Sequence, residues 1–164
     1  MIIAGKNDLS LACLIERGGV YHYLKGANPP DIIAELIELL PALPEFDSNA
    51  LLQAVLEREA LMSTGVGRGI AVPHPRNPVL GDGALPFVAL GFPAAPINWN
   101  TPDGSMVHSV FLVVSVSAKQ HLSALSKINF LCQQEKIHSL IKAQASKDEV
   151  VAAIRKTENS WIEK

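Results

Sequence analysis

The sequence is poor in cysteine, in aromatic residues and in excess charge of either sign. Its two cysteines, Cys13 and Cys132, lie far apart and lack the close spacing of a zinc site, so we expect reduced, buried thiols. The formal net charge is −2 and no dense run of Lys and Arg occurs, which disfavours a nucleic acid or an anionic membrane as the main ligand. A local positive patch for a phosphate remains compatible with this charge.

Long hydrophobic runs are also missing. The longest apolar stretches, near residues 87–90 and 110–116, are much shorter than the roughly 20 residues of a membrane-spanning helix. Lys6 and Asp8 interrupt the N-terminus, which therefore lacks the apolar core of a signal peptide. We expect a cytoplasmic protein with no membrane insertion.

What the chain does have is a globular composition, with 48% hydrophobic and 18% charged residues among 164. This length suits a single domain, which we place at residues 9–157, with terminal tails at 1–8 and 158–164. No repeat, linker or low-complexity segment divides it.

Helical and strand-like patterns alternate along the chain. Asp47 or Ser48, Ser117 and the Ser146/Glu149 pair are typical helix N-caps. These features predict an α/β fold with a mixed, mostly parallel β-sheet flanked by helices on both faces. The apolar strand at 107–116 should be central, and 93–105 should form a hairpin-like connection to it. Helices are expected at 9–16, 30–40, 48–59, from 119 onward, at 136–142 and at 147–156, and strands at 20–24, 70–72, 87–92 and 107–116.

The most distinctive stretch is 63–76, STGVGRGIAVPHPR, in which three glycines occupy alternate positions. We expect a glycine-rich turn and then a brief strand that Pro73 ends, with His74 held between two prolines on a stiff backbone. The stretch lacks the spacing of a Walker loop or a dinucleotide fingerprint. Two interpretations remain open: a tight structural turn, or backbone N–H groups that approach an anion, with the Thr64 hydroxyl beside them.

A second histidine belongs to the same hypothesis. His121 lies in the first turn of a helix directly after a strand, where ligands gather in α/β sheets. It would meet His74 if their two strands are parallel neighbours. Arg58 ends the helix before the glycine turn and could reach the same region, or it could form a surface ion pair with Glu57 or Glu59.

The remaining polar residues favour structural roles. Two histidines and an arginine are a poor zinc set, and no nucleophile elbow or Ser-His-Asp pattern is present. The other candidates are three histidines expected at the surface or in packing, His22, His108 and His138, and two loop aspartates, Asp82 and Asp103.

A family pattern is visible in Arg58-Glu59 followed by Ser63-Thr64-Gly65-Val66-Gly67-Arg68-Gly69-Ile70-Ala71-Val72-Pro73-His74. It resembles the enzyme IIA domain of the fructose/mannitol type from the bacterial phosphoenolpyruvate-dependent phosphotransferase system, and is most similar to the nitrogen-regulatory branch. A second block matches at Pro96-Ile97, Asp103-Gly104, Val110-Phe111 and His121-Leu122. The resemblance covers residues 9–157.

The resemblance implies a phosphotransferase component that works through a phosphohistidine. His74 would be the phosphoacceptor, His121 the second active-site histidine, Arg58 the active-site arginine and Thr64 the threonine of the turn. The donor would be HPr or its nitrogen-branch relative NPr, the recipient a regulatory target or a IIB protein, and no cofactor or metal is required. The alternatives are a sugar-transport IIA that serves a separate IIB protein, and a catalytically silent interaction module.

Two departures from the family pattern concern the site. Pro75 replaces the glycine that usually follows the histidine and removes one backbone N–H beside the phosphate. Arg68 stands where asparagine is common, and Arg76 adds another cation. We expect these changes to alter phosphate affinity or the choice of partner without removing the nucleophile.

Overall fold

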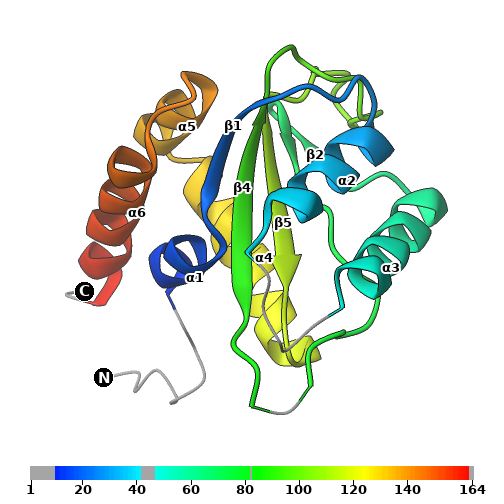
Figure 1. The fold of residues 1–164 in the computed structure, drawn as a ribbon. Helices are drawn as coiled ribbons and strands as arrows, with labels where there is room; N and C mark the ends of the chain where they lie inside the picture. Colours follow the sequence, from blue (N-terminus) through cyan, green and yellow to red (C-terminus); the bar gives the residue numbers. More distant parts are fainter. Residues whose placement is uncertain (1–9, 42–46, 82, 163–164) are drawn as a thin grey trace.

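The computed structural model describes residues 10–41, 47–81 and 83–162, so the expectations for the 1–8 tail and for Asp82 lie outside the described residues. The chain forms one β-sheet between two layers of helices (Figure 1). The helices are α1 (Leu11–Gly18), α2 (Pro29–Leu39), α3 (Ser48–Leu61), α4 (Ala118–Cys132), α5 (Glu135–Lys142) and α6 (Lys147–Ile162), and the strands are β1 (Val20–Leu24), β2 (Gly65–Gly67), β3 (Ile70–Ala71), β4 (Phe87–Pro93) and β5 (Ser109–Val114).

The sheet has the strand order β1-β4-β5-β3-β2. The pairs β1–β4 and β3–β5 are parallel, whereas β4–β5 and β2–β3 are antiparallel. This confirms an α/β fold with a mixed sheet and a central β5, but the expectation of a mostly parallel sheet is wrong for the described strands. The reason is local: the 94–108 connection returns the chain antiparallel to β4, and the glycine turn folds β2 back on β3.

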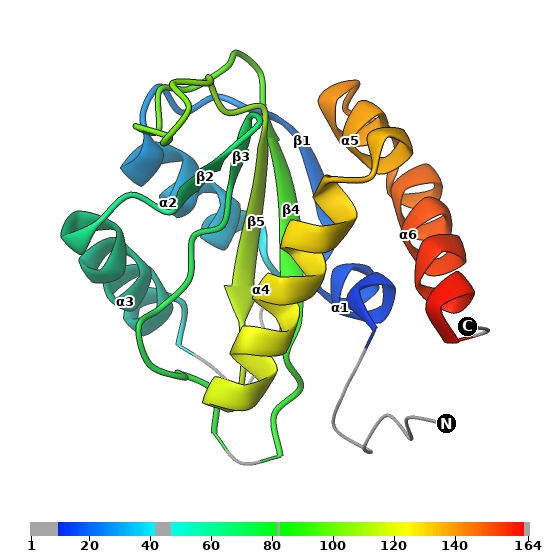
Figure 2. The same cartoon turned by 180° about the vertical axis from the view of Figure 1, so that it is seen from behind.

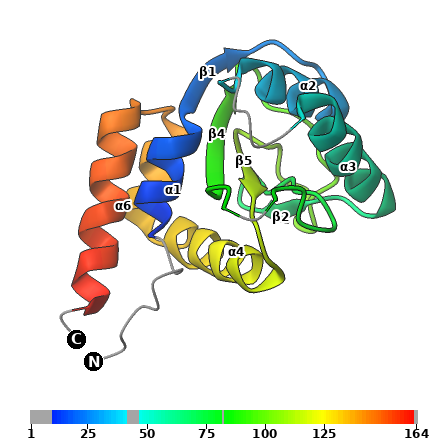
Figure 3. The ribbon, with the colours of Figure 1, turned by 60° about the horizontal axis from the view of Figure 1, so that its bottom comes forward.

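Helices cover both faces of the sheet, as predicted (Figures 2 and 3). One apolar core lies between the sheet and α1, α4, α5 and α6, and the other lies between the sheet and α2 and α3. Along β5, Phe111 and Val113 enter the first core while Val110 and Leu112 enter the second. Successive strand residues point to opposite faces, so β5 is buried on both sides.

The predicted caps begin their helices. The Asp47 side chain accepts from the N–H groups of Asn49 and Ala50 at the start of α3, and Ser117 accepts from Gln120 at the start of α4. These bonds satisfy N–H groups that have no partner within the helix. Among the described residues, none of the helices has the length and apolar character needed to cross a bilayer.

The last helix corrects an expectation. We expected it to end near Lys156 and the chain to continue as a tail, but α6 runs to Ile162. The buried carboxylate of Glu158 accepts hydrogen bonds from the backbone N–H groups of Leu11, at 2.9 Å, and Ala12, at 3.0 Å. The end of α6 therefore caps the start of α1 from 146 residues or more away in sequence, which local patterns do not reveal.

This cap gives a stability prediction. The Glu158→Ala variant should unfold with a free energy lower by about 1.5–3 kcal/mol, because two N–H groups lose a charged acceptor at a buried helix end. Chemical denaturation of this variant beside Asn159→Ala, an exposed neighbour on α6, measures the difference. Equal midpoints for the two variants would contradict the role of the cap.

Candidate functional site

His74 follows β3 directly, on backbone that is still paired with the sheet. The N–H of Val113 donates to the carbonyl of Pro73 at 3.1 Å, which extends the β3–β5 pairing to the residue before His74. The Nδ1 of His74 lies 2.7 Å from the carbonyl oxygen of Val72. Since a carbonyl only accepts, Nδ1 carries the proton and Nε2 keeps a free lone pair. The half-buried imidazole thus presents Nε2 as a nucleophile.

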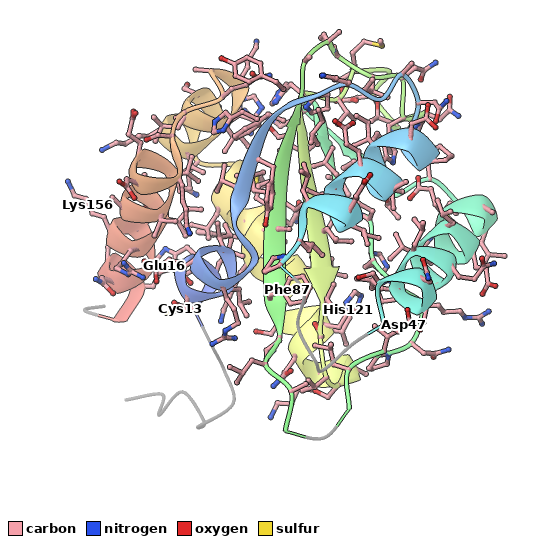
Figure 4. The ribbon with its side chains drawn as sticks, in the orientation of Figure 1. Cys13, Glu16, Asp47, Phe87, His121 and Lys156 are labelled. Atoms are coloured by element: carbon pink, nitrogen blue, oxygen red, sulfur yellow. The ribbon has the colours of Figure 1, made fainter. Side chains whose placement is uncertain are left out.

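His121 lies beside His74 at the start of α4, where Figure 4 labels it. The two ring centroids are 4.5 Å apart and the ring planes are inclined by 52°. This confirms that the two histidines meet because β3 and β5 are parallel neighbours.

Arg58, in the last turn of α3, brings a positive charge that acts on both imidazoles. Its guanidinium donates to the carbonyl of Met62 at 2.7 Å, while Glu57 accepts from Gln53. Burial lowers the pKa of both site imidazoles, and the charge of Arg58 lowers both further. The pKa of His121 falls to about 4. Both rings are therefore neutral at physiological pH.

The low pKa of His121 predicts a pH dependence. The unfolded chain takes up the proton near the ordinary pKa of 6.5 and the folded chain only near 4, so stability falls as the pH drops through this window. His108, whose pKa burial also lowers to about 4, adds to the fall. We expect two imidazoles to titrate near 4 by NMR, and a shallower loss of unfolding free energy in His121→Gln. Ordinary titration of every ring would contradict this.

The glycine-rich turn is a hairpin whose backbone is held by the protein itself. Gly67, Arg68 and Gly69 have φ values of +101°, +54° and +78°, a left-handed stretch that glycine tolerates best. The N–H of Arg68 donates to Asp103 and that of Gly69 donates to Ser105. These two N–H groups are used internally, which favours the structural interpretation of the turn over an anion cradle.

A carboxylate that the sequence did not single out lies beside the turn. Glu59 accepts from the backbone N–H of Thr64 at 3.1 Å, from the Thr64 hydroxyl at 2.6 Å and from the indole N–H of Trp99 at 2.8 Å. Thr64 as a site residue stays a prediction, and in this structure its hydroxyl proton is donated to Glu59. The nearest signal in the sequence is the Arg58-Glu59 pair, which indicates a family motif or a surface ion pair but not this set of contacts.

An open cavity of about 460 Å³ lies against the turn and α4. Arg58 and Arg68 both contribute to its lining, but the Arg68 guanidinium pairs with Glu135 at 2.8 Å and donates to the Cys132 carbonyl at 3.3 Å. Its lining residues are Arg58, Ser63, Thr64, Val66, Gly67, Arg68, Ile70, Val72, His74, Leu125, Ser126, Ile128, Asn129, Cys132 and Gln133.

Pro75 and Arg76 line a smaller cavity of about 100 Å³ together with His121. Arg76 is exposed. Arg76 therefore lies on the His121 side of the site. Arg68, in contrast, is held by its contacts with α4 and α5.

The remaining histidines have packing roles. The Nε2 atom of His22 is 3.1 Å from the carbonyl oxygens of Gln144 and Ala145. His108 contacts Ser109, and His138 donates to the carbonyl of Arg68 at 2.8 Å. Both cysteines are free thiols. Within the described ranges, no three His, Cys, Asp or Glu side chains gather as a metal site.

The fold and the paired histidines define a class, an α/β domain that presents an imidazole at the end of a short parallel strand. Residues 14–157 match the family "Phosphoenolpyruvate-dependent sugar phosphotransferase system, EIIA 2". The chain belongs to this family and is a phosphotransferase component.

The relatives include both sugar-transport and regulatory proteins. The chain is 29% identical over 134 residues to the fructose-specific EIIABC component of Bacillus subtilis, covering 80% of this chain but only 21% of that protein. It is 29% identical over 121 residues to the nitrogen regulatory protein of Pseudomonas aeruginosa, covering 72% of this chain and 77% of the relative.

A solved structure supports the fold. The nitrogen regulatory protein IIA-Ntr of Neisseria meningitidis superimposes with a TM-score of 0.72 at 24% identity, over 84% of this chain and 93% of that one. At this level of identity the likeness shows the fold alone.

Proposed function

We propose that the chain is a phosphoryl carrier that accepts the group on Nε2 of His74. The observation that carries the proposal is the hydrogen bond from His74 Nδ1 to Val72, 2.7 Å long, which leaves Nε2 as the free nitrogen. A neutral imidazole is nucleophilic near physiological pH, and its phosphoramidate retains enough transfer potential to pass the group on.

Arg58 and His121 would stabilise the transferring group. Phosphoryl transfer depends mainly on positioning and charge neutralisation, and a guanidinium suits the phosphate oxygens. His121, neutral because its pKa is about 4, acts as a hydrogen-bond donor and adds no second positive charge. In the reaction, the bond between phosphorus and the carrier imidazole breaks as the bond to His74 Nε2 forms.

The family supports a proposal for the partners. The donor is an HPr-type carrier, HPr or NPr, and the role is regulatory, a proposal that the nitrogen regulatory relative supports. A second candidate is a IIA component for sugar transport that passes phosphate to a separate IIB protein, which the fructose-specific relative favours. Transfer of label to a IIB cysteine would favour the second candidate.

The test is intact-mass spectrometry after incubation with phosphoenolpyruvate, enzyme I and either HPr or NPr. We expect one added phosphate that is lost in acid, as phosphoramidates are. No added mass with either carrier would overturn the proposal and favour the silent interaction module that Pro75 suggests.

A further inference from the structure

We infer that Glu59 is a positioning residue for phosphoryl transfer. Trp99 and Thr64 hold its carboxylate beside the glycine-rich turn. There the carboxylate orients His74 and favours release of the phosphoryl group from His74. The inference rests on the proposed function of His74. It adds a negative residue to a site in which Arg58 is positive.

The Glu59 carboxylate is held on both oxygens. Oε1 accepts from the Thr64 backbone and from the Trp99 indole, and Oε2 accepts from the Thr64 hydroxyl. The same indole N–H lies 3.3 Å from the Thr64 hydroxyl oxygen. Trp99 is 1% exposed and Thr64 5%, so these donors have little freedom. A charged acceptor with three such donors is fixed in place.

A continuous path of hydrogen bonds links this carboxylate to the imidazole. Glu59 fixes the backbone and side chain of Thr64, and the Thr64 carbonyl accepts from the N–H of Val72 at 3.0 Å. The carbonyl of Val72 in turn accepts the Nδ1 proton of His74. Glu59 therefore supports the peptide that selects the tautomer of the nucleophile.

The second effect is electrostatic. The charged and titratable groups that act on His74 are Arg58 and Glu59 from α3 and His121 from α4, and Glu59 opposes Arg58 by raising the pKa of His74. A phosphoryl group on Nε2 adds negative charge to the ring on which the charge of Glu59 already acts. Repulsion in a partly buried site raises the energy of the phosphorylated form and so favours onward transfer.

Two variants separate the two effects. Glu59→Gln removes the charge and keeps an oxygen acceptor, so the phosphoryl equilibrium between carrier and chain should shift toward the chain by about threefold to tenfold, and the pKa of His74 should fall. Trp99→Phe keeps the charge and most of the buried volume but removes the indole donor. It should shift that equilibrium less than Glu59→Gln does and broaden the tautomer distribution of His74.

Glu57→Gln is the matched control. It removes the same charge from the same helix, but the Glu57 side chain is exposed and accepts a hydrogen bond from Gln53. Residues two apart on a helix do not face the same side. The control should match the wild type in the phosphoryl equilibrium and in the titration of His74.

The experiment combines NMR titration of the unphosphorylated protein with a phosphoryl-exchange equilibrium against the carrier. Wild-type behaviour of Glu59→Gln in both measurements, with wild-type labelling intact, would overturn the inference and leave the proposed function standing. Absence of labelling in the wild type would overturn the proposed function and the transfer part of the inference. The titration, which needs no phosphate, then decides alone whether Glu59 sets the ionisation and tautomer of His74.

Discussion

The His74→Ala variant is expected to accept no phosphoryl group from phosphoenolpyruvate, enzyme I and an HPr-type carrier, whereas the wild type accepts one. His74 combines a fixed Nδ1 proton, a free Nε2 and the nearby charge of Arg58. His121 shares the surroundings, but its pKa of about 4 marks a weakly basic ring that is a poor replacement nucleophile. Intact-mass spectrometry measures the loss directly.

The control for this loss is His22→Ala. His22 lies on the edge strand β1, where its ring contacts the carbonyl of Gln144, and is remote in the sheet order from β3. This variant should accept one phosphate as the wild type does. Label that persists in His74→Ala would place the acceptor elsewhere. Label that disappears equally in His22→Ala would show that the loss is not specific to His74.

The Arg58→Ala variant is expected to lose about 10²–10³-fold in the rate of phosphoryl acceptance, the usual cost of removing a preorganised group that stabilises the transition state. Arg58 is the cation that acts on both site imidazoles. Arg58→Lys should recover only part of the rate, because an ammonium lacks the planar fork that suits two phosphate oxygens. Rapid-quench labelling measures the rates.

Arg155→Ala is the matched control for the lost positive charge. Arg155 pairs with Glu16 across the α1–α6 contact, at 2.9 Å, on the helix layer that does not include α3. Its removal should leave the acceptance rate unchanged. A rate for Arg58→Ala within about twofold of the control would show that Arg58 does not stabilise the transferring group, since the expected loss is about 10²–10³-fold.

Much of the fold was predictable because its signals are local. Asp47 and Ser117 predict the starts of α3 and α4 because their side chains are typical N-caps, and Pro73 ends the strand before His74. The meeting of His74 and His121 required one assumption, that two strands are parallel neighbours, and the β3–β5 pairing satisfies it. The turn-rich connection between β4 and β5 signals their antiparallel pairing, which the expectation of a mostly parallel sheet did not take into account.

What sequence patterns could not show depends on contacts between distant residues. The indole of Trp99 donates to Glu59, which lies 40 residues away in sequence, and no residue pattern near Trp99 indicates this partner. Glu158 caps α1 from the last helix, so α6 extends past the point where its own pattern weakens. The same holds for the turn, where Asp103 takes up the N–H of Arg68 that an anion could otherwise have used.

Phosphorus and nitrogen NMR of the phosphorylated chain identifies directly the atom that carries the phosphoryl group. Because His74 Nδ1 donates to the Val72 carbonyl, we expect a single phosphohistidine at His74 with phosphorus bonded to Nε2. The Nδ1 proton should remain hydrogen-bonded after phosphorylation. Phosphorus on Nδ1 of His74, or on any other side chain, would contradict the account.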